Sequence, residues 1–123
     1  MMRITAAFAA IFLFVQPSFA HHRYHYRHSE TYSDPRPHAW CGWQVRQWLG
    51  VSDRAYNLAR NWAHYGSPAG GPAVGVIAVY VHHVGIVVAV PSPHSIILKS
   101  GNDGNAIRIR ERSIRGIIAW RYP

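Results

Sequence analysis

The spacing of apolar residues changes near residue 66, and this change predicts the main division of the fold. Before it, apolar side chains recur every three or four positions in two stretches, which is the period of an amphipathic helix. After it, short runs rich in β-branched residues are broken by clusters of Pro, Gly and Asn, which are typical of antiparallel strands and their turns. Helices followed by strands predict an α+β domain.

The first helical stretch, CGWQVRQWLG, is expected to end at Gly50, because glycine is favoured just after the last turn of a helix. Its expected apolar face consists of Cys41, Val45, Trp48 and Leu49. We expect Arg46 and Gln47 on the other side, in contact with water.

The second helical stretch is VSDRAYNLARNWAHYG. Ser52 or Asp53 is expected to cap its start, and Gly66 is expected to terminate it. Its expected apolar face consists of Ala55, Leu58, Ala59 and Trp62.

An antiparallel sheet of five to six strands is expected to pack against these helices. Five strands are expected after the loop SPAGGPA, at residues 75–80, 83–90, 95–100, 106–112 and 113–120. In the fourth strand, Ile107 and Ile109 alternate with Arg108 and Arg110. We therefore expect the isoleucines to be buried and the arginines to face water.

The first 20 residues, MMRITAAFAAIFLFVQPSFA, are typical of a secretory signal peptide. One charge, at Arg3, precedes an apolar run, and small residues lie one and three positions before the expected cleavage between Ala20 and His21. The apolar run is about half the roughly 20 residues that a membrane span needs, although a short retained anchor is the alternative. Cleavage predicts a secreted or periplasmic protein.

Residues 21–37 contain no aliphatic side chain and mix His, Arg and Tyr with two prolines, so we expect a disordered arm. Residues 38–123 then form one domain. In the arm, His22, His25 and His28 lie three apart, which fits either a metal site or a cationic, aromatic tether. We favour the tether, because no carboxylate or thiol alternates with these histidines to fix a metal geometry.

The chain is strongly basic. Loss of Arg3 with the signal peptide lowers the formal net charge from +8 to +7. A basic, exported protein is attracted to anionic surfaces such as cell-wall polymers, lipid headgroups or nucleic acid.

The chain has one cysteine, Cys41, so it forms no internal disulfide. The thiol is an inert buried group, a site for intermolecular pairing, or a nucleophile. At the first turn of a helix, free backbone N–H groups and the helix dipole favour the thiolate. This location predicts a lowered thiol pKa.

A cysteine nucleophile needs a base, and imidazole is the natural one. Of the nine histidines, His82 and His83 open the otherwise apolar strand HVGIVVAV, where Gly85 leaves room beside them. Strand alternation sends their rings to opposite faces, so only one of them can meet Cys41. Asn102, in KSGNDGNA, is a candidate to orient the imidazole, with ordinary turn chemistry as the alternative.

Several motifs follow one another in a characteristic order: WCGW, PAVGVIAV, HVGIVV, SGND and a final RGIIAWRYP. In this order and spacing, residues 38–123 resemble the papain-like bacterial cell-wall hydrolases, which include the CHAP amidases and the NlpC-type endopeptidases. The resemblance is to a small secreted proteobacterial or phage-like branch.

This resemblance implies a papain-like core in which a helix carries the nucleophile and a sheet carries the base. Cys41 then matches the nucleophile, His83 the general base and Asn102 the orienting residue, and the backbone N–H of Cys41 would stabilise the oxyanion. Members cut amide bonds of peptidoglycan through a thioester, without a metal or cofactor. The chain departs from the family at Val76, where Asp is common, and at His82, where Gly is common.

We therefore expect a secreted, monomeric cysteine hydrolase of peptidoglycan or its stem peptides, held at the anionic envelope by basic residues. The alternatives are an inactive envelope-binding module of the same fold and a periplasmic metal-binding protein that uses the His-rich arm. Nucleic-acid binding through the arginines of residues 108–115 is a weaker alternative, and we expect no nucleic-acid partner.

Overall fold

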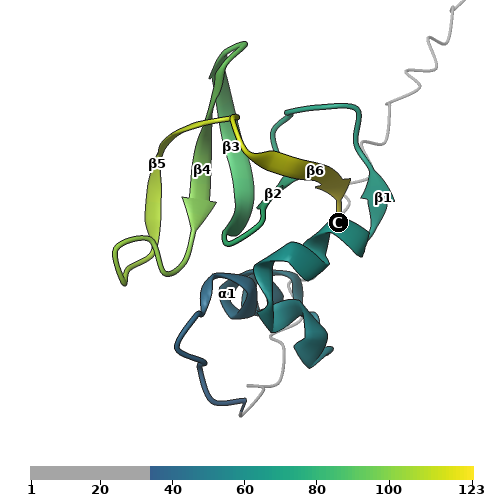
Figure 1. Ribbon diagram of the computed structural model, residues 1–123, viewed down its shortest axis with the longest axis vertical. Coiled ribbons are helices and arrows are strands. Elements are labelled where there is room, and N and C mark those ends of the chain that lie inside the picture. The colour runs from purple at the N-terminus through teal and green to yellow at the C-terminus, as the bar shows by residue number, and fades with distance from the viewer. Residues whose placement is uncertain (1–33) are drawn as a thin grey trace, which may run out of the picture.

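The computed structural model describes residues 34–123, so the expected signal peptide and most of the expected arm lie outside the described part. Three short helices precede six strands (Figure 1). The helices are α1 (Cys41–Leu49), η1 (Arg54–Asn57) and η2 (Ala59–His64). The strands are β1 (Ser67–Pro68), β2 (Ile77–Tyr80), β3 (Val84–Ser92), β4 (Ser95–Ser100), β5 (Arg108–Ser113) and β6 (Ile117–Tyr122). The predicted α+β class and the antiparallel sheet are confirmed.

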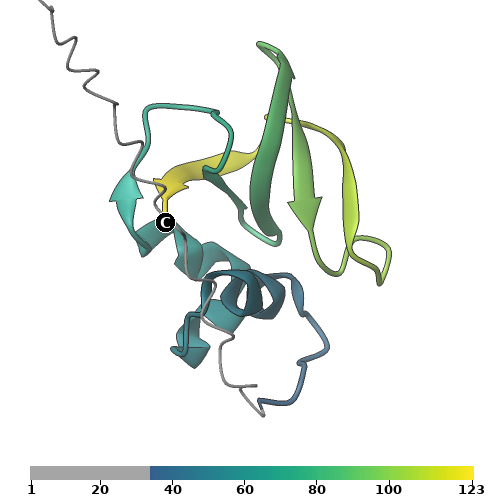
Figure 2. The ribbon, with the colours of Figure 1, turned by 180° about the vertical axis from the view of Figure 1, so that it is seen from behind.

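The six strands form one antiparallel sheet in the order β1-β6-β2-β3-β4-β5. In a flat sheet, β6 and β5 would lie about 19 Å apart, at ~4.8 Å per strand spacing. Only residues 114–116 connect Ser113 of β5 to Ile117 of β6, and this length of chain spans at most about 14 Å. The sheet must therefore curl, and the connection crosses its end (Figure 2).

The curled sheet has two differently covered faces. The helix face packs against α1 and η2 through a core of Cys41, Val45, Ala59, Trp62, Ile77, Val79 and Val84. The opposite face, which we call the inner face, carries a second core of Ala78, Val87, Ile96 and Leu98. These inner-face residues are buried by the sheet's own side chains and by Ile114, because the curl brings distant strands together.

Helix α1 forms as predicted. Its first backbone hydrogen bond runs from the N–H of Gln44 to the carbonyl of Trp40, so Cys41 is its first residue. Gly50 ends it with a φ of 67°, a left-handed conformation that glycine adopts without steric cost. The predicted boundaries of this helix are confirmed.

The prediction that Arg46 faces water is wrong. Its side chain is 1% exposed, and every nitrogen of the guanidinium donates a hydrogen bond. Nη1 lies 2.7 Å from a carboxylate oxygen of Asp34 and also donates to Asn57. Nε and Nη2 donate to the carbonyls of Val51 and Ser52, at 3.0 and 2.9 Å. A buried charge is tolerated here because every guanidinium nitrogen donates a hydrogen bond and the charge is paired with Asp34.

The end of the expected arm takes part in this cluster. Asp34 is buried, and its second oxygen also pairs with the exposed Arg54 at 3.2 Å. The described chain is therefore attached to the domain from its first residue onward, several residues earlier than the expected boundary at residue 38.

The second predicted helix is wrong in type, since η1 and η2 are 3-10 helices separated by Leu58 in an extended conformation. Asp53 caps η1 as expected, and accepts from the N–H of Ala55 at 2.9 Å. A continuous α-helix would need the carbonyl of Tyr56, but the indole of Trp62 donates to that oxygen at 2.7 Å. Side-chain competition for backbone carbonyls thus interrupts the helix.

The predicted burial of the isoleucines in the fourth strand is wrong. In β5, Ile107 and Ile109 flank the strand start and are 52% and 61% exposed. Arg110 and Arg112 instead pair with Asp103, and strand register places them opposite Leu98 and Ile96 of the inner face. Arg108 and Arg110 are exposed as predicted, and the Arg110 side chain stays 50% exposed while it pairs with the buried carboxylate.

The remaining strand predictions are close to the structure. β4 has the expected bounds, whereas β2 and β3 begin one or two residues late. The predicted strand at 113–120 starts only at Ile117, because the chain turns at residues 114–116. β1 was not predicted. Within residues 34–123, no helix is long and apolar enough to cross a membrane.

Replacing Asp34 with Ala should lower the free energy of unfolding by about 3–5 kcal/mol, because it leaves the Arg46 charge buried without its partner. Arg54→Ala removes only the exposed partner of the same carboxylate and should cost less than about 1 kcal/mol. Urea unfolding followed by tryptophan fluorescence measures both values. Equal, small effects would show that this ion pair is not important for stability.

Candidate active site around Cys41

The Cys41 thiol is buried where α1 meets the start of β3. Its sulfur lies 4.0 Å from the carbonyl oxygen of His82, to which it can donate a weak hydrogen bond. The backbone N–H of Val84 points at the sulfur as well. The thiol therefore contacts the chain immediately before and immediately after His83.

Burial raises the pKa of the Cys41 thiol, because removal from water disfavours the thiolate. The backbone N–H groups of Val84, Gly42 and Cys41 and the charge of Arg112 lower it, but their effect is smaller. The predicted lowering of the thiol pKa is therefore wrong. The start of α1 does favour the thiolate, but desolvation outweighs it, and the resting thiol is protonated at neutral pH.

The imidazole of His83 is held by a buried serine. Its Nε2 lies 2.8 Å from the hydroxyl oxygen of Ser100, the last residue of β4. A side chain at Gly85 would collide with this serine, since an added Cβ would lie 2.8 Å from the Ser100 Cβ. As predicted, Gly85 leaves room beside the histidine. Atoms of β4 occupy this room, since they lie where a side chain of residue 85 would be.

Burial is the main cause that lowers the pKa of His83 to about 4, and the nearby positive charges of Arg112 and Arg110 act in the same direction. The carboxylate of Asp103 acts in the opposite direction. The imidazole is therefore neutral at pH 7, with one donor and one acceptor nitrogen. When Nε2–H donates to Ser100, Nδ1 carries the free lone pair.

Within residues 34–123, no hydrogen bond joins the Cys41 sulfur to the His83 ring. The two groups share a charged neighbour, because the guanidinium of Arg112 influences the pKa of both. The same guanidinium lies 5.8 Å from the ring centre of Tyr80.

Asp103 organises the charges around His83. Its carboxylate accepts two hydrogen bonds from Arg110, at 2.6 and 2.7 Å, and one from Arg112 at 3.3 Å. The hydrogen bonds from Arg110 are the main cause that lowers the Asp103 pKa to about 2. The carboxylate is therefore charged at every pH at which the protein is expected to work.

Asn102, the residue expected to orient the imidazole, makes no hydrogen bond with His83 in the described part of the chain. It adopts a left-handed conformation with a φ of 49° and lines an open pocket of about 450 Å³. Ser100 makes the contact that was expected of Asn102. The role of Asn102 in catalysis stays a prediction.

The loop that carries Asn102 and Asp103 packs directly on the first turn of α1. A Cβ at Gly101 would lie 2.7 Å from the side chains of both Trp40 and Gln44. The indole N–H of Trp40 also donates to Asn105 at 3.3 Å. These contacts fix the loop beside the start of α1, where the thiol lies.

Sequence reasoning missed Ser100 and Asp103. Ser100 could have been found, since it continues the alternation of buried Ile96 and Leu98 along β4. Asp103 gave no local signal, because Asn-Asp-Gly also forms ordinary turns.

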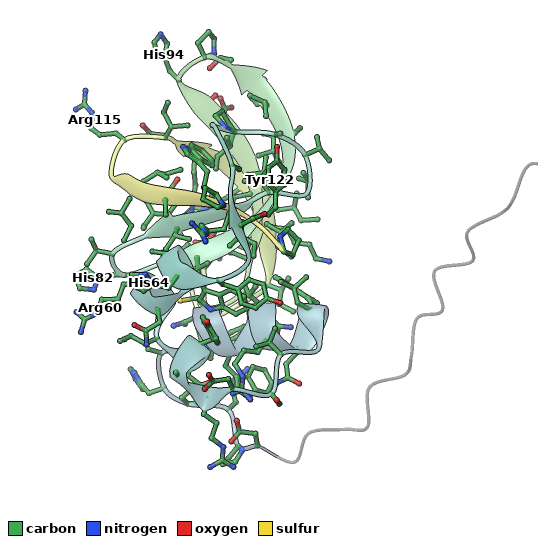
Figure 3. The ribbon with its side chains drawn as sticks, turned by 90° about the vertical axis from the view of Figure 1, so that its right-hand side faces the viewer. Arg60, His64, His82, His94, Arg115 and Tyr122 are labelled. Atoms are coloured by element: carbon green, nitrogen blue, oxygen red, sulfur yellow. The ribbon has the colours of Figure 1, made fainter. Side chains whose placement is uncertain are left out.

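The other histidines of the described chain contribute differently. His82 is exposed and directs its ring outward (Figure 3), so only its backbone meets Cys41. His94 lies in the turn between β3 and β4, at the end of the molecule remote from the helices (Figure 3). In residues 34–123, no group of three His, Cys, Asp or Glu side chains could hold a metal ion. The histidines at 22, 25 and 28 lie outside the described residues.

Comparison of the chain with protein-family models, with curated proteins and with solved structures gave no match.

At pH 7, iodoacetamide should alkylate Cys41 in the folded protein more slowly than it alkylates free cysteine, because burial keeps the thiol protonated and inaccessible. Unfolding in guanidinium chloride should remove the difference. Mass spectrometry over time gives the rate constants. A native rate above that of free cysteine would mean that the thiol pKa is lowered.

Acidification should destabilise the fold as the pH falls from about 6.5 to 4. The unfolded chain takes up a proton on His83 near the ordinary histidine pKa of 6.5, whereas the folded chain resists until about 4. Between these values the unfolded state binds more protons, so stability decreases with decreasing pH. In His83→Asn, the decline of the thermal midpoint over this range should be shallower. A further decline below 3.8 belongs to Asp103, whose folded pKa is about 2.

Proposed function

We propose that this protein is a secreted cysteine hydrolase with a papain-like core that cuts amide bonds of peptidoglycan. One observation carries the proposal. Cys41 begins α1 and contacts the backbone on both sides of His83, while a buried serine holds Nε2 of that imidazole. A thiol, an imidazole and a group that orients the imidazole are the components of nucleophilic amide cleavage.

Because thiol and imidazole are both neutral at rest, proton transfer must accompany attack. Nδ1 of His83 takes the thiol proton as the sulfur attacks the amide carbonyl carbon. The oxyanion can accept from the backbone N–H of Cys41, which has no partner within α1 because the first helical bond starts at Gln44. The imidazolium then protonates the leaving amine, and the C–N bond breaks to give a thioester. Water, deprotonated by the same nitrogen, releases the acid and restores the thiol.

The surrounding charges tune this step. The imidazolium that forms on His83 is favoured by the carboxylate of Asp103 and disfavoured by Arg110 and Arg112. Ser100 acts as a positioning residue, since it holds Nε2 and leaves Nδ1 for the thiol.

The choice of substrate rests on three features of the sequence. These are the resemblance of residues 38–123 to cell-wall hydrolases, the expected signal peptide, and the net charge of +7 that remains after loss of Arg3 from a chain of +8. A basic protein is concentrated at an anionic envelope, where peptidoglycan is the amide-rich polymer.

A catalytically inactive envelope-binding module is the second candidate. It is favoured by the burial of Cys41, which is 4% exposed, because a substrate carbonyl must reach the sulfur. Hydrolysis of purified peptidoglycan separates the two candidates.

The protein should release new amines from purified peptidoglycan, and mass analysis of the fragments should identify the bond. Cys41→Ser should reduce the rate to background, because a serine hydroxyl is a much weaker nucleophile than the thiol in this site. His83→Ala should lower the rate by about 10²–10⁴, the usual effect of losing a general base. Ser100→Ala should reduce the rate less than His83→Ala does. The exposed His82 provides the control, and His82→Ala should be close to wild type. Asn102→Ala should be far less damaging than His83→Ala, because packing or water can partly replace an orienting amide.

No release of amines by the wild-type protein under any condition would favour the binding module. A Cys41→Ser variant as active as the wild type would exclude the thiol as nucleophile. In either case, thermal unfolding of each variant must show that it is folded.

A further inference from the structure

The open pocket beside α1 is separate from the pair formed by Cys41 and His83. It lies between the segment that precedes α1 and the loop at residues 102–105, and it has a volume of about 450 Å³. Its lining consists of Arg36, Pro37, His38, Trp40, Asn102 and Asn105. No carboxylate belongs to this lining, so the guanidinium of Arg36 gives the pocket a positive charge, and the amides of Asn102 and Asn105 can supply hydrogen-bond donors.

The amide of Asn105 has a defined orientation. The indole N–H of Trp40 is only a donor, so the atom that it meets at 3.3 Å must be the carbonyl oxygen of Asn105. The NH₂ group of the same amide is left with both protons for another acceptor. This orientation makes Asn105 a donor toward a ligand.

Arg36 supplies a charge that the described protein does not neutralise. Its guanidinium carbon lies 4.4 Å from the centre of the Trp40 ring, and it forms no ion pair within residues 34–123. Arg36 also covers that ring, which leaves the covered face unavailable for stacking with a sugar. The nearest loop carboxylate, Asp103, is already occupied by Arg110 and Arg112.

We propose that this pocket binds a carboxylate of the substrate, with Arg36 and Asn105 as its main donors. A guanidinium presents a planar pair of N–H groups that matches the two oxygens of a carboxylate, and an amide NH₂ supplies a further donor in a plane. Trp40 precedes Cys41 directly in the chain, so the ligand would lie beside the scissile amide. This assignment rests on the proposed function and predicts preference for stem peptides with a free carboxylate near the amide that is cut.

The test measures binding rather than turnover. A Cys41→Ser protein is titrated calorimetrically with a soluble stem-peptide fragment that has free carboxylates, and with the same fragment in amidated form. Three further variants each lower the net charge by one: Arg36→Gln, Asn105→Asp and Arg115→Gln. In Asn105→Asp, a carboxylate oxygen can still accept from Trp40, but the donor is lost. Arg115 is the matched control, since it is exposed at the far end of the molecule (Figure 3).

Arg36→Gln and Asn105→Asp should each weaken binding of the acidic fragment by about tenfold or more, the effect of one lost charge-assisted hydrogen bond. Arg115→Gln should bind as the Cys41→Ser parent does, and the amidated fragment should bind weakly to all four proteins. Equal weakening by Arg115→Gln, equal binding of the amidated fragment, or no detectable binding would overturn the proposal. Stronger displacement by inorganic phosphate than by acetate would also overturn it, in favour of a general anion site.

Binding and hydrolysis give independent answers. If the fragment binds through its carboxylate but the wild-type protein hydrolyses nothing, the proposed carboxylate site is supported and the proposed hydrolase activity is rejected. If acidic and amidated fragments are hydrolysed at the same rate, the hydrolase activity is supported and the proposed carboxylate site is rejected.

Discussion

The buried guanidinium of Arg46 is the contact on which the helical half of the molecule depends. It joins α1 to Asp34, to the loop after α1 and to Asn57 at the end of η1. Such a cluster adds little net stability compared with an apolar core, but removal of one partner is costly. Its effect is therefore geometric. It holds the outer side of α1 in one position, so that the first turn and its thiol meet the start of β3.

Burial of Cys41 and His83 also determines which protonation state each of them has before a substrate binds. Desolvation raises the pKa of Cys41 and lowers that of His83, so both groups are neutral near pH 7. A cysteine site of this kind differs from one with a preformed thiolate–imidazolium pair, because its thiol is weakly reactive until a substrate occupies the site. In the exported hydrolase that we propose, a protonated and buried thiol would also be less exposed to oxidation.

The curl of the sheet gathers polar groups that are distant in the sequence. The short connection from β5 to β6 forces the sheet to curl, and Arg110 and Arg112 of β5 pair with Asp103. The same loop, held on Trp40 through Gly101 and Asn105, carries Asp103, whose charge acts on His83, and lines the open pocket with Asn102 and Asn105. One loop, residues 101–105, therefore contributes both to the surroundings of His83, the proposed base, and to the proposed carboxylate pocket.

The sequence alone determined the features that depend on local periodicity. The helix from Cys41 to Leu49, its glycine stop, the antiparallel sheet and the bounds of β4 follow from apolar spacing and turn residues, which act over a few neighbouring positions. It also singled out Cys41, the one cysteine of the chain, and the His82–His83 pair, which places two polar rings at the start of an apolar strand.

Only the tertiary structure decided the features that depend on contacts between distant residues. The burial of Arg46 needs Asp34 twelve positions earlier, and the break in the second helix needs an indole that competes for a carbonyl. The exposure of Ile107 and Ile109 and the pairing of Arg110 with Asp103 likewise depend on the fold. The shift of each site pKa likewise depends on how much water the fold excludes. Local polarity predicts where a side chain would go in water, whereas a partner brought near by folding can reverse that preference.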